Sequence, residues 1–418
     1  MRSERTSPRL HYSFIALGAI VVAIFIALGL GRHGYTSVLP AMQDSLKLSN
    51  SQTGELQSWN LVGYLLTVVF AGLLASHYGP RRVIAVSLFV AAAAMLVTGL
   101  VPTFNGARLG RFLAGVGGAG ANVPAMALVS AWFGASRRGL ASGAAVAGSS
   151  VGLIVTGPLV PWVLDRSGPG GWPVCWFVFA AMALVACLVC AVLLRNRPEE
   201  VGVVPLGESA VEHRARTEDQ HRAALGWSQV WRSGTLWHVA AIYAAFGFSY
   251  IIYSTFFIRH LMKEAGFTKT DAGLLWLKVG MVSVISGFIW GGVSDRWGRR
   301  VALVCVFVLQ GVSFAAFGLS QKLGIIYFSA GLFALTAWSI PALVAAQCGD
   351  VFGPRLAPAA LGLVTIVFGI GQAFGPYFAG RIADATKSFS PAFLTAGLVA
   401  LVLGAGGSWL LRGPARKT

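Results

Sequence analysis

The chain has 418 residues, of which 56% are hydrophobic and only 11% are charged, and its mean hydropathy is +0.71. A soluble domain carries roughly 25% charged residues, so this composition excludes an ordinary soluble protein and indicates an integral membrane protein. The net charge of +17 would suggest nucleic-acid binding in a soluble chain, but membrane proteins gather Lys and Arg in the loops on one side, and nucleic acid is not an expected partner.

Apolar stretches long enough to cross a bilayer recur along the whole sequence, since a core of about 30 Å needs about 20 helical residues. They lie near residues 13–38, 52–75, 82–102, 107–132, 140–163, 173–194, 236–260, 270–293, 300–320, 323–348, 357–380 and 389–411. We expect an all-α integral membrane protein with twelve transmembrane helices. Its predicted parts are an N-terminal six-helix bundle (1–194), a cytoplasmic linker (195–233) and a C-terminal six-helix bundle (234–418).

The loops that would share one side of the membrane are rich in arginine, namely Arg81, Arg82, Arg137, Arg138, Arg296, Arg299 and Arg300. Basic loops favour the cytoplasmic side. Because twelve spans return the chain to its starting side, both termini are expected in the cytoplasm and the protein in the inner (plasma) membrane, surrounded by lipid.

Metal and enzyme chemistry find little support in the sequence. The five cysteines fall in or at the edge of apolar spans and show no metal-ligand spacing. No nucleotide-binding loop or nucleophile–base pattern is present either. We therefore expect no cofactor and no catalytic activity.

The two halves of the chain repeat each other at an offset of 218 to 219 positions. The segment Gly291–Arg300 reads GGVSDRWGRR, and its blurred counterpart Gly72–Arg82 reads GLLASHYGPRR. Further along, Phe133 matches Phe352, and the pair Gly157-Pro158 matches Gly375-Pro376. Parallel duplicated halves are an architecture of membrane transporters.

The two repeated loops, between spans two and three and between spans eight and nine, resemble the signature of the major facilitator superfamily. Span four adds Arg111 through Gly117 (RFLAGVG), similar to the superfamily's Arg-x-x-x-Gly-x-Gly motif, and span five adds Gly148, Gly152 and Gly157-Pro158, similar to its glycine-proline motif. The resemblance covers nearly the whole chain and implies alternating access between two six-helix halves. The glycine-proline motif is associated with antiporters, but helix packing is the reading we favour.

The C-terminal copy of the loop motif carries an acid that the N-terminal copy lacks. Asp295 can pair with Arg296 or Arg299 and act as a gating latch at the cytoplasmic end of its helix. Ser76 stands at the equivalent position in the first half, so a latch there is expected to be weaker. A role as topological anchors alone remains open for both copies.

Three basic residues, Arg32, Arg111 and Lys278, lie within predicted spans, whereas no Asp or Glu lies deep in one. A charge at the bilayer centre costs at least about 2.5–3.5 kcal/mol. All three residues are expected between the outer face and the mid-membrane, where cations facing one cavity would bind an anion. Snorkelling, or hydrogen bonding to helix carbonyls, is the alternative for each.

Arg32 has the best case, because His33 and Tyr35 follow it on a glycine-loosened helix and its guanidinium fits a carboxylate bidentately. An arginine eight residues before the proline that ends the first helix, as Arg32 stands before Pro40, resembles superfamily members that carry organic anions. Arg111 matches an arginine that the superfamily links to proton coupling or substrate binding. The predicted substrate-binding residues are Arg32, Tyr35, Arg111, Asn122, Tyr250, Tyr253 and Lys278, with Asn60, Tyr64, Tyr243, Trp276, Trp338 and Gln372 as further candidates.

We expect a monomeric secondary active transporter that carries a small organic anion of the monocarboxylate type by proton-coupled symport. The linker text from Arg195 to Gly207 is similar to loops of bacterial oxalate/formate and monocarboxylate transporters. Three coupling schemes remain open. The substrate carboxyl or Lys278 carries the proton, His33 carries it, or the protein exchanges one anion for another without a proton. Efflux of hydrophobic compounds is the rival function. The predicted coupling and gating residues are His33, Arg111, Asp295, Arg296 and Arg299.

Overall fold

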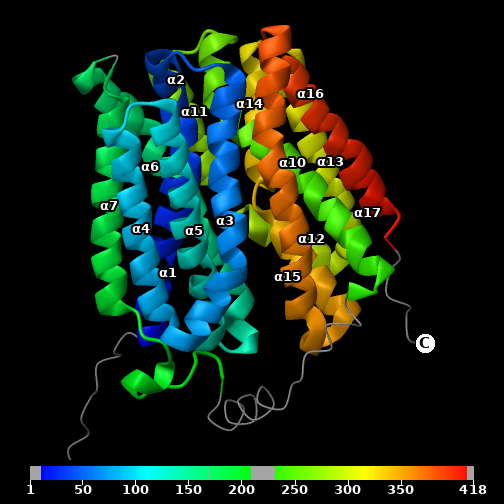
Figure 1. Ribbon diagram of the computed structural model, residues 1–418. Helices are drawn as coiled ribbons and strands as arrows, with labels where there is room; N and C mark the ends of the chain where they lie inside the picture. The colour runs from blue at the N-terminus through cyan, green and yellow to red at the C-terminus, as the bar shows by residue number, and fades with distance from the viewer. Residues whose placement is uncertain (1–10, 169, 209–230, 412–418) are drawn as a thin grey trace, which may run out of the picture.

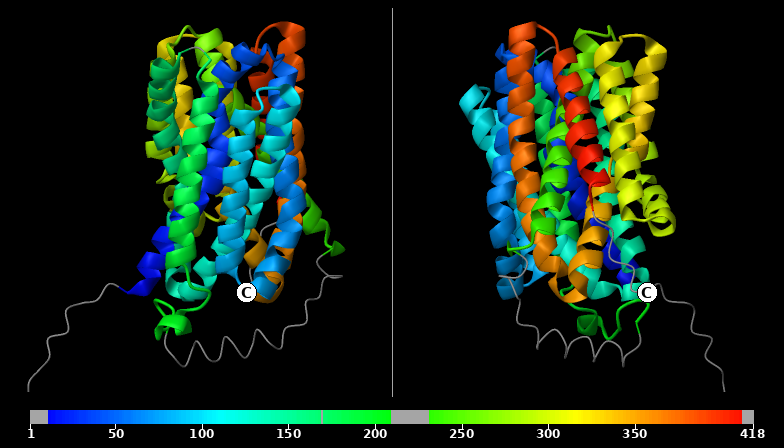
Figure 2. Two further views of the ribbon diagram at one scale, coloured as in Figure 1. Left: turned by 60° about the vertical axis from the view of Figure 1, so that its left-hand side comes forward. Right: turned by 90° about the vertical axis from the view of Figure 1, so that its right-hand side faces the viewer.

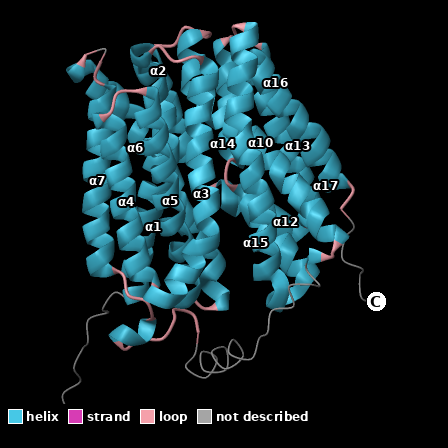
Figure 3. Ribbon diagram, in the orientation of Figure 1, coloured by secondary structure: helices cyan, strands magenta, loops and turns pink. Residues whose placement is uncertain are grey.

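The computed structural model describes residues 11–168, 170–208 and 231–411, and linker residues 209–230 lie outside this description. Within these ranges the chain is helical and contains no β-strand (Figure 3). Twelve of its helical segments are long and apolar enough to cross a membrane. The predicted all-α membrane fold is thereby confirmed, and every predicted span has a matching helix.

The first half contains six membrane-crossing segments (Figure 1). They are the continuous α1 (Tyr12–Ile24), π-helix η1 (Phe25–His33) and α2 (Gly34–Leu46), followed by α3 (Asn50–Tyr78), α4 (Pro80–Leu100), α5 (Phe104–Trp132), α6 (Ala135–Ser167) and α7 (Trp172–Leu193). A short 3-10 helix, η2 (Pro198–Val201), follows α7.

The second half contains the other six, and its helices are more often interrupted. They are α10 (Gly234–Lys263), α11 (Lys269–Ser283) with α12 (Ser286–Trp297), α13 (Arg299–Leu319), α14 (Leu323–Thr336), α15 (Ser339–Thr386), and α16 (Ser390–Val399) with η3 (Ala400–Gly406) and α17 (Gly407–Trp409). The 48-residue α15 contains the end of the tenth span and all of the eleventh.

Both copies of the repeated loop motif place a glycine at the turn between two spans. Gly79 joins α3 to α4 with φ of 84°, and Gly298 joins α12 to α13 with φ of 90°. Side chains with a Cβ disfavour this left-handed region of backbone space, whereas glycine enters it freely. Both glycines therefore permit the same sharp turn between two antiparallel spans.

The two halves meet on one side of the bundle and diverge on the other. Helices α3 and α15 lie side by side in the upper part of Figure 1, and α6 packs on α11 on the same side. We call this side the closed face. The start of α1, the end of α7 and the start of α10 lie at the opposite end (Figure 2), which we call the linker face.

Close backbone approaches hold the closed face together. A Cβ added to Gly273 of α11 would lie 2.1 Å from the carbonyl oxygen of Gly157 in α6, and one added to Gly54 of α3 would lie 2.0 Å from that of Pro376 in α15. Gly148 and Gly152 instead approach the first span within their own half. The glycine-proline motif thus packs helices in both places.

A cavity of about 520 Å³ separates the halves on the linker side of this closure. Its deep end is lined by Tyr243, Ser283 and Trp338, near the middle of the bundle. Gly139 of α6 and Ala345 of α15 line it closer to the linker face. The cavity therefore runs from mid-bundle toward the linker face.

Candidate functional site

The candidate site begins where the first span changes helix type. The π-helix η1 ends with Arg32 and His33, both of which are buried in the bundle. π-Helical turns occur frequently at functional sites, because they shift the side chains that follow to a new direction. Here the α-helix resumes at Gly34, directly after the two titratable side chains.

Arg32 lies between the two halves with part of its guanidinium unused. Its Nη1 donates to Oη of Tyr250 at 3.4 Å, and its Cζ lies 4.7 Å from the ring centroid of Tyr64. The residue is only 7% exposed, and its buried Nη2 has no hydrogen-bond partner. No carboxylate of the described residues forms a salt bridge with it.

Tyr250 of α10 offers a second unused donor. Its Oη accepts hydrogen bonds from Nη1 of Arg32 and from Nε2 of Gln372 in α15. A phenol has one proton to donate, and the described residues supply no acceptor for it. Two donors without acceptors therefore converge where the first, seventh and eleventh spans meet.

Tyr64 and Asn122 of the N-terminal half hold the guanidinium of Arg32 in place. Nδ2 of Asn122 donates to Oη of Tyr64 at 2.7 Å, which fixes the ring that stacks on Arg32. Asn122, a predicted substrate-binding residue, thus acts on Arg32 through Tyr64. An aromatic face attracts a cation, so the ring holds the guanidinium without neutralising its charge.

His33 and Trp338 connect the cluster with the cavity. Their ring centroids lie 5.4 Å apart, and Trp338 lines the deep end of the cavity. Nε1 of Trp338 donates to Oγ of Ser150, which lies 2.8 Å from Oγ of Ser283. This polar seam joins the two halves beside the first span, and His33 is its titratable member.

Arg111 and Tyr35 serve the N-terminal half rather than the cavity. Arg111 is fully buried, and it donates from Nη1 to the carbonyl of Gly31 at 2.6 Å and from Nη2 to Oε1 of Gln57 at 2.7 Å. Oη of Tyr35 donates to the carbonyl of Thr53 at 2.8 Å. Both residues tie neighbouring spans together, so carbonyl bonding, the alternative weighed for Arg111, is what the structure shows.

Tyr253 and Lys278 are not brought to the Arg32 cluster. Tyr253 shares a hydrogen bond with Oγ of Ser329 and packs among the phenylalanines of the C-terminal half. Lys278 is exposed on the outside of the bundle, with Nζ 5.2 Å from the ring centroid of Tyr327. The faces of α10 and α11 on which they lie point away from the cavity between the halves.

The predicted latch residues lie at the linker face within the C-terminal half. Arg299 contacts Oδ1 of Asp295 at 2.5 Å and Oδ2 of Asp350 in α15 at 2.9 Å. Arg296 is exposed, and it takes part in no ion pair among the described residues. The cluster therefore joins α12, α13 and α15, and the acid at position 350 is a member that the sequence pattern did not single out.

Sequence reasoning also missed Asp384, which joins the halves on the closed face. Its carboxylate accepts hydrogen bonds from the backbone N–H groups of Asn50 and Ser51 at 2.9 and 2.8 Å. These amides begin α3, where the helix dipole favours a negative charge. A lone Asp near the end of span eleven gave no signal of this cross-half contact.

The site as a whole suits an anion. Arg32 and Arg111 place two guanidinium groups inside the bundle, and neither has a carboxylate partner among the described residues. No cluster of His, Cys, Asp and Glu that could hold a metal ion occurs in the described ranges. In the Arg32 cluster the groups without partners are donors, namely Nη2 of Arg32 and the O–H of Tyr250, and they require an acceptor.

Known proteins similar to this chain are membrane transporters. A family model described as "Uncharacterised MFS-type transporter YbfB" matches residues 24–406. The chain is 24% identical to the probable sulfoacetate transporter SauU of Cupriavidus necator over 93% of this chain and 91% of that protein. It is 23% identical to the hexuronate transporter of Bacillus subtilis over 89% of this chain and 88% of that protein.

The fold is similar to that of a solved transporter structure. A bacterial homologue of the human lysosomal transporter Spinster, crystallised in an inward-facing and unoccupied conformation, superposes with a TM-score of 0.74 over 97% of both chains. The two sequences are 18% identical. At this identity the likeness concerns the fold alone.

Proposed function

The chain belongs to the major facilitator superfamily of transporters, and we propose that it carries a small organic anion of the monocarboxylate type by proton-coupled symport. One observation carries the choice of an anion. Arg32 is buried between the halves, its Nη2 has no acceptor, and no carboxylate of the described residues pairs with it. A buried positive charge without a negative counter-charge is costly, and a bound carboxylate would supply both the charge and the missing acceptor.

The surrounding groups favour a carboxylate in particular. Nη2 of Arg32 and the O–H of Tyr250 can both donate to one carboxylate. The neighbouring cavity of about 520 Å³ has the size of a small-molecule site. The names of the relatives support the same class, because sulfoacetate and hexuronates both carry a carboxylate.

Alternating access gives the cavity its place in the cycle. If the arginine-rich loops are cytoplasmic, the linker face is the inner face and the cavity opens inward. Arg32 and Tyr250 belong to different halves. An anion bound to both would therefore change the equilibrium between the inward-open and outward-open states, and coupling requires such a change.

Proton symport is the coupling we favour. The described residues that line the 520 Å³ cavity include no Asp or Glu, so they offer no carboxylate relay. His33 is buried beside Arg32 and against Trp338, where its protonation would be felt by a bound anion. Lys278 faces away from the cavity and loses support as a proton carrier. Anion exchange remains the second candidate. Efflux of cationic compounds would need an acid in the cavity, and the described lining residues include none.

Uptake into proteoliposomes tests this proposal. Labelled lactate, sulfoacetate and glucuronate are offered with an acid-outside pH gradient to the natural protein and to Arg32→Gln. We expect gradient-driven uptake of at least one of them, and its loss in the variant. Arg108→Gln is the matched control, because Arg108 pairs with Glu55 at 3.4 Å on the partly exposed outer part of α5. Equal uptake by Arg32→Gln, or no carboxylate uptake at all, would contradict the proposal.

The same vesicles separate symport from exchange. Under symport, empty vesicles accumulate the anion when a pH gradient is imposed. Under exchange, uptake depends on anion loaded inside and ignores the gradient. A His33→Gln variant that keeps exchange and loses gradient-driven accumulation would identify His33 as the coupling residue.

A further inference from the structure

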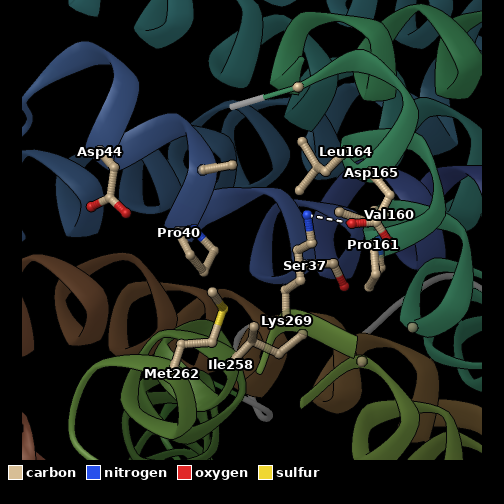
Figure 4. Close-up of a pocket in the computed structure, with 14 residues that line it drawn as sticks. Ser37, Pro40, Asp44, Val160, Pro161, Leu164, Asp165, Ile258, Met262 and Lys269 are labelled. Carbon is tan, nitrogen blue, oxygen red and sulfur yellow. Dashed lines mark ion pairs between the residues drawn. The ribbon is translucent and has the colours of Figure 1, made fainter. Parts of the chain in front are cut away.

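A second cavity, of about 450 Å³, lies between the halves at the closed face (Figure 4). Four helices surround it: α2, α6, α10 and α11. Pro40, Pro161 and Met262 form part of its apolar wall, and the charged side chains Asp44, Asp165 and Lys269 also line it. We call this cavity the vestibule.

Ion pairs across the vestibule join the two halves. Nζ of Lys269 in α11 lies 2.6 Å from Oδ1 of Asp165 in α6 (Figure 4). Nη1 of Arg259 in α10 lies 2.9 Å from Oδ1 of Asp44 in α2. In both pairs the base belongs to the C-terminal half and the acid to the N-terminal half. Opening this face must separate each base from its carboxylate.

The inner end of the vestibule points toward the Arg32 cluster. Ser37 lines the cavity, is 6% exposed, and its Oγ has no hydrogen-bond partner. It follows Arg32 by five residues, which is about 7.5 Å along a helix axis. The buried hydroxyl thus lies between the charged rim of the vestibule and the guanidinium.

We propose that the vestibule is an outer subsite for the transported anion, in which Lys269 and the hydroxyl of Ser37 bind the carboxylate before it reaches Arg32. The inference rests on the proposed function. In the closed state the carboxylate of Asp165 occupies Lys269. When the halves part, the carboxylate of an arriving anion replaces it. One carboxylate exchanges for another, so the lysine need not lose a charged partner.

The alternative is that these ion pairs only hold the face closed. Two substitutions of one pair separate the explanations, because Lys269→Gln and Asp165→Asn remove the same ion pair. A purely closing role predicts the same change in transport for both. A subsite predicts opposite changes, since the first substitution removes the binding cation and the second frees it.

The test measures the KM for uptake from the side of the vestibule in oriented vesicles. Lys269→Gln is expected to raise this KM by roughly two- to fivefold, the range of a partly exposed charge, and Asp165→Asn to lower it. Ser37→Ala is expected to raise it as well. For uptake from the linker side, the KM values of Lys269→Gln and Asp165→Asn are expected to agree with each other.

A surface control separates local binding from general attraction. Lys322 is exposed at the start of α14, and Lys322→Gln is expected to leave the KM unchanged. The subsite is overturned if Lys269→Gln and Asp165→Asn shift the KM in the same direction, or if Lys322→Gln matches Lys269→Gln. Absence of carboxylate transport by the natural protein would instead refute the proposed function itself.

Discussion

Adding one methyl group at the closed face should shift the protein away from the state described here. A Cβ at Gly273 would lie 2.1 Å from the carbonyl oxygen of Gly157 and 3.0 Å from Cγ of Pro161. The backbone oxygen cannot swing aside, so α6 and α11 must separate by about 1 Å to restore ordinary contact. We expect Gly273→Ala to disfavour closure of this face while each half keeps its own packing.

Overpacking of this kind costs about 1–3 kcal/mol. Because 1.4 kcal/mol is a factor of ten, the ratio of open to closed molecules should rise by roughly 5- to 150-fold. Ala41 lines the vestibule and provides a reporter. In Ala41→Cys, labelling by a membrane-impermeant maleimide should accelerate by that factor when Gly273→Ala is added.

Gly18→Ala is the control, because a Cβ there meets nothing within 4 Å. The protein without Ala41→Cys reports labelling of its own cysteines. Labelling of the Gly273→Ala variant at the rate seen with Gly18→Ala would refute the reasoning that backbone contact between Gly157 and Gly273 maintains the closed face.

Three further predictions concern contacts of single residues. Arg111→Gln should lower the melting temperature of the purified protein more than Arg108→Gln does, because it removes two buried charged hydrogen bonds worth about 1.5–3 kcal/mol each. Asp384→Asn should accelerate Ala41→Cys labelling, since a carboxylate at a helix N-terminus contributes about 0.3–1 kcal/mol; an unchanged rate would exclude it from closure. Partial burial raises the pKa of Glu264, but the contact with His260 and the hydrogen bonds from the Phe389 N–H and the Ser388 hydroxyl outweigh it and lower the pKa from 4.5 to about 2. Its contribution to stability should be full above about pH 4.5 and be lost toward pH 2, and Glu264→Gln should remove this part of the acid dependence in a melting series.

The positions of the membrane-spanning helices were predictable from the sequence, because one bilayer thickness sets the length of every span. The turn glycines at positions 79 and 298 were predictable for a related reason: the repeat places them at the same point of each half. Arg32 was singled out by its position near the outer end of span one, and the structure places it between the halves, in contact with Tyr250.

The direction of a side chain around its helix was less accessible. Lys278 and Arg111 lie in the membrane-spanning helices α11 and α5, yet one faces outward beside Tyr327 and the other is enclosed by its own half. Which face of a helix meets a neighbour depends on packing between spans far apart in sequence. The π-helix ending at His33 adds to the difficulty, because it changes the register of all residues that follow.

Direct binding of a carboxylate to the purified protein tests the central claim most closely. Titration calorimetry would compare the natural protein with Arg32→Gln and Arg32→Lys, using the carboxylate that the uptake assay selects. A buried charged hydrogen bond is worth about 1.5–3 kcal/mol, so the account predicts that Arg32→Gln weakens binding by roughly 10- to 150-fold, with partial recovery in Arg32→Lys. Binding by Arg32→Gln within about twofold of the natural protein would contradict an anion site built on Arg32.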